Sequence, residues 1–298
     1  MLVVISVGLS LLVLAAQFHF SKKRQTALSH RFETLVLLRQ LLLLSRKHRA
    51  ATHYALAYKL SSDSIRKVNA IYDNILEVSE LLQSHVSFDS RPMYRIYHLR
   101  LIAMHSDWQN RSLVRNQSIH GKTIRHSMFL MDEVMIIWLI QSEREEMSRE
   151  YHMNWQQILD CMETLTKLRM SIPGIEKADM EKPEEYARFK FYASQTHRKL
   201  NQLSMICPIS SGSPICTRAM HALTEIASSN ELTQPADSLY ELTSDISSIV
   251  SQVYDQVLSD MTKSLYQPLP DINDKAINTR LWYTDTSKDF VRGERVEL

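Results

Sequence analysis

Glycine is so rare in this chain that few fold classes remain open to it: the sequence has five glycines in 298 residues. Tight hairpin turns need glycine where φ is positive, and nucleotide-binding loops need it where the backbone approaches a phosphate. Long helices need it for neither purpose. The chain is also rich in Leu, Met, Gln, Glu, Lys, Arg and Ala, which favour helices. The sequence therefore predicts an almost wholly α-helical protein.

The composition limits the kinds of binding partner that we expect for the protein. Hydrophobic residues make up 44% and charged residues 23% of the chain, as in proteins with a folded core. The net charge is +2, both signs are mixed, and no basic tract follows residue 25, so we expect no nucleic-acid partner. The three cysteines are too few for a disulfide framework. A single bridge between Cys207 and Cys216 remains open.

The N-terminal segment is apolar from residue 2 to 16, except for Ser6 and Ser10. A signal peptide has its positive charges before the apolar stretch, whereas Lys22, Lys23 and Arg24 follow it here. We therefore expect residues 1–20 to be one transmembrane helix. The positive-inside rule then predicts a single-pass protein of the cell inner membrane with most of the chain cytoplasmic. A cleaved signal peptide is the alternative.

Apolar residues recur at spacings of three and four along most of the remaining chain, which predicts eight helices. Short connections between them favour up-down packing, as two four-helix bundles linked by a long helix or as one elongated array. We expect residues 21–267 to form a helical sensor-like domain and residues 268–298 a loosely ordered tail. The predicted helices cover residues 30–60, 63–82, 92–108, 113–149, 155–172, 184–205, 217–229 and 236–265.

Two arginines interrupt apolar helix faces. Arg49 shares a face with leucines of the first helix, and Arg169 shares one with Trp155, Ile158 and Leu165. A guanidinium keeps its charge, and burying it unpaired costs several kcal/mol, so each must meet a carboxylate, backbone carbonyls or a bound anion. Internal ion pairs, or side chains that reach out to solvent, are one interpretation. The other is that both arginines converge on a small planar anion.

The same region resembles a known family. Residues 37–51 (LLRQLLLLSRKHRAA) are similar to the first-helix motif of the nitrate- and nitrite-sensing (NIT) domain. Residues 158–169 (ILDCMETLTKLR) resemble a later helix of that family, and residues 192–203 resemble the helix after it. The family's further arginine and glycine have no counterpart at residues 228–231, and Ala50 stands where glycine is common.

The resemblance, which covers about residues 30–260, implies two four-helix bundles that bind nitrate or nitrite through arginines, with Arg49 and Arg169 at the matching positions. Together with the expected N-terminal anchor, we expect a membrane-anchored sensor in which an anion between the two arginines shifts the helix packing and the signal passes to a partner protein or within a homodimer. The alternative function is a structural scaffold that binds other proteins and has no small-molecule ligand.

No catalytic motif emerges from the sequence. It contains no H-E-x-x-H, G-x-S-x-G or C-x-x-C pattern, so we expect no enzyme, no cofactor and no metal site. His120 and His126 lie six residues apart and do not share a helical face. With Gly121 between them, they are interpreted as part of a solvated turn. The four residues Met128, Met131, Met135 and Trp138 are expected to fill the core.

Overall fold

The structure is a computed structural model and describes residues 2–58, 60–176, 183–208, 213–229, 234–265 and 267–270, with the side chains of 2–5 and 88 excepted. Within this part of the chain there are eight α-helices and two short 3₁₀ turns, η1 (Phe88–Ser90) and η2 (Trp108–Asn110), and no strand, which confirms the all-α prediction. The helices are α1 (Leu2–Ala57), α2 (Ser62–His85), α3 (Arg91–His105), α4 (Leu113–Gln141), α5 (Glu145–Glu176), α6 (Pro183–Ile206), α8 (Pro214–Ser228) and α9 (Ala236–Ser264).

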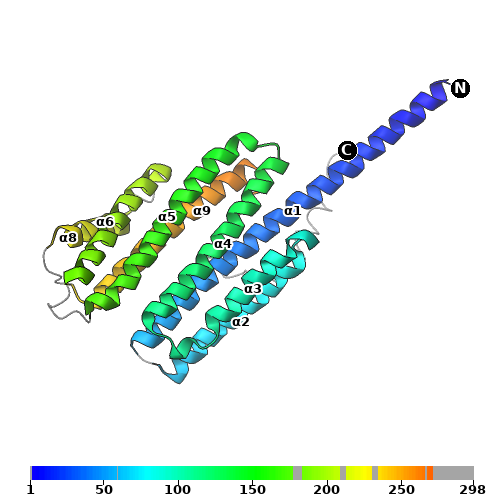
Figure 1. Ribbon diagram of the computed structural model, residues 1–298. Helices are drawn as coiled ribbons and strands as arrows, with labels where there is room; N and C mark the ends of the chain where they lie inside the picture. Colours follow the sequence, from blue (N-terminus) through cyan, green and yellow to red (C-terminus); the bar gives the residue numbers. More distant parts are fainter. Residues whose placement is uncertain are drawn as a thin grey trace.

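The helices pack in two groups of four (Figure 1). In the first group α1 contacts α2, α2 contacts α3, α3 contacts α4, and α4 returns to α1. In the second group α5 contacts α6, α6 contacts α8, α8 contacts α9, and α9 returns to α5. Helices α4 and α5 also pack against each other and join the two groups. One hydrophobic core runs through both groups.

The two groups are not linked by a long helix, and the prediction of one helix over 113–149 is wrong. Helix α4 ends at Gln141, and α5 begins only at Glu145. Between them Glu143 has φ of 59°, in the left-handed region, and its carboxylate lies 2.8 Å from the Arg24 guanidinium. Glycine usually occupies such a position, so the sequence carries no sign of this turn.

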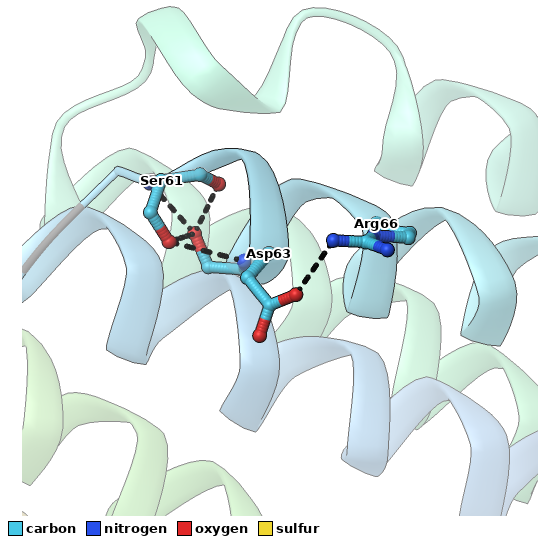
Figure 2. A network of polar contacts seen from close by, with 4 residues as sticks. Ser61, Asp63 and Arg66 are labelled. Atoms are coloured by element: carbon cyan, nitrogen blue, oxygen red, sulfur yellow. Dashed lines mark hydrogen bonds and ion pairs between the residues drawn. The ribbon is translucent and has the colours of Figure 1, made fainter.

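Ser61 starts helix α2 by a capping box. Its hydroxyl accepts a hydrogen bond from the Ser64 backbone N–H at 3.2 Å, and the Ser64 hydroxyl accepts one from the Ser61 N–H at 2.9 Å. In the first turn Asp63 pairs with Arg66 at 2.8 Å, on the outside of the helix (Figure 2). The cap fixes where the chain turns back after α1.

Helix α1 is continuous over 56 residues, and its N-terminal part projects beyond both groups (Figure 1). No glycine or proline occurs between residues 17 and 30, so the chain has no break where the expected anchor ends. The expected membrane-spanning helix is not supported, because over the described residues no helix is both long enough and apolar enough to cross a bilayer. The apolar stretch, residues 2–16, has 15 residues, against about 20 for a span.

Four further expectations can be compared with the structure. Met128, Met131, Met135 and Trp138 are buried, as predicted for core residues. Helix α5 does not stop at Pro173 but continues to Glu176. Cys161, Cys207 and Cys216 are buried, and none of them forms a disulfide within the described part of the chain, so the open question of a Cys207–Cys216 bridge is answered against it. The predicted tail lies outside the described residues from 271 onward.

Candidate anion-binding site

The sequence-predicted arginines lie on facing helices at the junction of the two groups. Arg49 is on α1 and Arg169 is on α5, and both line one cavity. Arg169 is 5% exposed, as its place in the apolar face of α5 predicts. Arg49 is partly buried. Neither side chain extends into bulk water.

Arg125 of α4 also lines this cavity, but it pairs with Glu163 at 3.2 Å. Arg46 is a further arginine at the same cavity, and the sequence analysis missed it. It lies one helical turn before Arg49 on α1, and this spacing of three was the signal that could have found it. Its Nη1 donates to the Tyr254 hydroxyl at 3.1 Å, and its Nη2 donates to the Ser247 carbonyl at 2.8 Å. Arg46, Arg49 and Arg169 are called the arginine cluster below.

Helix α9 supplies the hydrogen-bond acceptors of the cluster, and all of them are neutral. Arg49 Nη2 donates to Ser247 Oγ at 3.2 Å. Arg169 Nε donates to Thr243 Oγ1 at 3.1 Å, and its Nη2 donates to the Thr243 carbonyl. Hydroxyls and carbonyls satisfy individual N–H groups, but they do not offset the net charge of three cations.

No carboxylate among the described residues lies within ion-pair distance of the arginine cluster. Arg39 shows the usual arrangement for comparison. It lies on the same helix as Arg46 and is 8% exposed, and its Nε donates to an Asp255 carboxylate oxygen of α9 at 2.7 Å. Within the described part of the chain, a counter-ion thus lies beside one buried arginine of α1 and none beside Arg46 or Arg49.

Burial, together with the positive charge of the cluster, affects the pKa values of Arg49 and Arg169. Burial, and after it the neighbouring Arg46, lowers the pKa of Arg49 to about 9. Burial, followed by the charges of Arg49 and Arg46, lowers the pKa of Arg169 well below its ordinary value. Both shifts mean that the folded protein disfavours the positive charges of Arg49 and Arg169. An anion between the two guanidinium groups would offset the repulsion between them and raise both pKa values.

The cavity at the cluster is small, with a volume of about 10 Å³, which is the space that one water molecule needs. A nitrate ion is larger than this space, so it does not fit beside the arginines while their hydrogen bonds to α9 are in place. The walls come from α1, α4, α5 and α9, and they include Arg46, Arg49, Gly121, Ile124, Met128, Met162, Leu165, Thr166, Arg169, Ser247, Val250 and Tyr254.

Gly121 sets how closely α4 approaches α5 at this cavity. It is buried inside α4, where the sequence analysis expected a solvated turn, and that interpretation is wrong. A Cβ at this position would lie 2.9 Å from Thr166 Cγ2. The glycine therefore serves close helix packing, and the helix runs through it without interruption.

Gly121→Ala tests this packing when it is combined with Thr166→Ser, which removes the opposing methyl group. In the natural chain Thr166→Ser leaves a small cavity, and we expect it to cost about 1 kcal/mol of unfolding free energy. In the Gly121→Ala background the same change relieves an overlap, and we expect it to stabilise the protein. Urea unfolding of the natural chain, the two single variants and the double variant measures both effects. An equal effect in the two backgrounds would contradict the proposed contact.

The chain was compared with protein-family models, curated proteins and solved structures, and none of the three comparisons finds a match.

Proposed function

We propose that this protein is a helical sensor that binds a small oxyanion, nitrate or nitrite, at the arginine cluster and signals by helix repacking. The observation that carries the proposal is the convergence of Arg46, Arg49 and Arg169 on one cavity, with no carboxylate among the described residues within ion-pair distance of these three. A fourth arginine of the lining, Arg125, has Glu163 as its counter-ion. Guanidinium groups match planar oxyanions in shape as well as in charge. The resemblance of residues 37–51 and 158–169 to the NIT domain points to the same ligand.

The position of the cluster supports a signalling role. Arg46 and Arg49 come from α1 of the first group, and Arg169 comes from α5 of the second. All three side chains donate hydrogen bonds to α9 of the second group. An anion that draws Arg46 and Arg49 away from Ser247 changes the contact between the groups. A ligand shifts a conformational equilibrium by its difference in affinity for the two states, and the lost α9 contacts supply such a difference. The output would pass to a partner protein or within a homodimer.

The proposed sensor is attached to the bacterial inner membrane by the N-terminal part of α1. Apolar side chains at residues 9, 11, 12, 13 and 14 are all exposed and point to every side of the helix. A helix that is apolar all round needs an apolar environment, which a lipid bilayer provides.

A scaffold without a ligand is the second candidate function. Three residues on the outer face of α3 favour it, since Ile96, Leu99 and Ile102 are exposed one helical turn apart. Such a face suits a protein partner. It does not account for the cations of the arginine cluster, which have no counter-ion among the described residues, so we rank it second.

Thermal melting of the full chain with and without nitrate, nitrite and sulfate tests the sensor. A ligand at a hundred times its dissociation constant adds about 2.7 kcal/mol of stability, which raises the Tm of a chain of this size by about 5–10 °C. We expect nitrate or nitrite to give this increase. Chloride at equal ionic strength is the control for screening of the cluster by salt.

If neither nitrate nor nitrite raises the Tm more than chloride does, the proposal is wrong. Where a shift is seen, Arg49→Lys separates charge from shape, because lysine keeps the charge but loses the planar fork. We expect this variant to lose most of the shift and to keep the helical circular-dichroism spectrum.

A further inference from the structure

Three histidines form a continuous chain inside the first group of helices. His105 Nδ1 of α3 lies 3.0 Å from His48 Nε2 of α1, and His48 Nδ1 lies 2.8 Å from His120 Nε2 of α4. His120 Nδ1 ends the chain at the Asn116 carbonyl oxygen, 2.8 Å away. His48 and His120 are fully buried, and His105 is partly exposed. The three are called the histidine chain below.

The end of the histidine chain fixes where its protons lie. A carbonyl oxygen only accepts, so His120 Nδ1 must donate, and its Nε2 in the neutral ring must accept from His48 Nδ1. His48 Nε2 then accepts from His105 Nδ1. In this arrangement all three rings are neutral, and each of the three hydrogen bonds contains one proton. The ring nitrogen that remains as an acceptor is His105 Nε2, at the exposed end.

One additional proton fits this chain without breaking a hydrogen bond. It enters at His105 Nε2, and His105 Nδ1 can pass its own proton to His48 Nε2. His48 can pass its Nδ1 proton to His120 in the same way, while every contact keeps one proton. The charge can therefore reside on any of the three rings. Its innermost position is His120, next to Gly121 of the anion cavity.

The surroundings keep the chain neutral in the absence of an anion. Burial lowers the pKa of His48 to about 3, with further lowering by His105 and Arg111. Burial also lowers the pKa of His120 far, and Arg49 of the arginine cluster contributes. The charged or titratable groups that face the chain are Tyr72 and Asp73 on α2, Arg111 after η2, and Arg49 on α1.

We propose that the histidine chain is a binding site for one proton, which the protein takes up when an anion occupies the arginine cluster. The inference rests on the proposed function, because the anion supplies the negative charge. An anion at Arg49 offsets the repulsion that this side chain exerts on His120, so the chain holds a proton more tightly. By reciprocity the protein binds the anion more tightly at lower pH. The sensor then reports anion and acidity together.

Calorimetric titration of the full chain with sodium nitrate measures this coupling. Repeating it in buffers of different ionisation enthalpy gives the number of protons taken up per anion. We expect uptake near zero at pH 7.5 that increases toward pH 5.5, and nitrate affinity at least about threefold higher at pH 5.5, given the strength of charge interactions over several ångströms.

His105→Gln is the decisive variant, because the glutamine amide can still donate to His48 but cannot bind a proton. We expect it to remove the uptake and the pH dependence while leaving nitrate affinity at pH 7.5 unchanged. His221→Gln is the matched control on the exposed face of α8 and should behave as the natural chain.

His53→Gln separates the chain from the other histidine near the cluster, whose pKa is lowered to about 4 by burial and then by Arg169 and Arg49. If this variant removes the uptake and His105→Gln does not, the inference is wrong. Nitrate binding without proton uptake in the natural chain also overturns it and leaves the proposed function intact. No nitrate binding at any pH refutes the proposed function and this inference with it.

Discussion

Replacing Arg169 with methionine is expected to raise the Tm of the chain in the absence of nitrate and to abolish the further increase that nitrate gives. Arg169 is buried, and no counter-ion lies within ion-pair distance of it among the described residues. Burial and the cations Arg49 and Arg46 depress its pKa, so a positive charge on Arg169 is less favourable in the folded state than in the unfolded state, where water solvates it.

The size of the effect follows from two opposing terms. Methionine removes the charge and fills similar space, but it leaves the Thr243 hydroxyl and carbonyl without their donor. Replacing buried ionic groups by apolar ones of similar volume stabilises proteins by about 1–4 kcal/mol in favourable cases, and each kcal/mol raises the Tm by about 2–4 °C here. Thermal melting by circular dichroism measures the change.

Arg39→Met is the matched control, made at a buried arginine that has a counter-ion. Arg39 donates to Asp255 at 2.7 Å, so its loss leaves a carboxylate without this partner. We expect this variant to lower the Tm and to keep the full nitrate response. A lower Tm in both variants would show that Arg169 is a structural residue and would remove the main support for the anion site.

A second large effect is expected from acid. The pKa of His48 is lowered to about 3 and that of His53 to about 4, and burial is the main cause of both shifts. The pKa of His120 is also far below its ordinary value. In the unfolded chain these three histidines titrate near 6.5, so below about that pH the unfolded state binds more protons than the folded state. Folding stability must therefore fall as the pH falls.

Each such histidine contributes up to about 1.4 kcal/mol per pH unit between its unfolded and folded pKa, so three give about 4 kcal/mol per unit near pH 5.5. Urea unfolding at pH 7.5, 6.5, 6.0 and 5.5 measures the slope. We expect a nearly constant free energy of unfolding at and above pH 7 and a steep decrease below about 6.5. A free energy of unfolding that stays constant down to pH 5 would show that the folded protein does not keep the three imidazole rings neutral.

The fold class follows from the sequence because long helices produce a simple and regular sequence pattern. Scarce glycine and apolar residues at spacings of three and four predicted the all-α class and the buried stripes that contain Leu38 and Trp155. The turn at Glu143 could not be predicted, since a glutamate holds a position that glycine usually marks. Its carboxylate contacts Arg24, which is more than a hundred residues away in the chain.

The candidate site was predictable in part for the same reason. Helical spacing placed Arg49 and Arg169 with the core residues, and the structure brings both to one cavity. The spacing could not reveal that Ser247 and Thr243 of α9 would be their acceptors, because that contact depends on how distant helices pack. The histidine chain was missed because its members lie on three different helices and meet only in the folded protein.

Helix α1 contains residues of both proposed binding sites near one end and the projecting N-terminal segment at the other. At about 1.5 Å per residue its 56 residues make a rod of roughly 84 Å. Arg46, His48 and Arg49 lie near one end of this rod, and its other end projects free of the bundles. A tilt of a few degrees at the arginines would sweep the far end through several ångströms. Helix α1 would thus act as a lever that converts a small displacement at the arginines into a larger one at its N-terminal end.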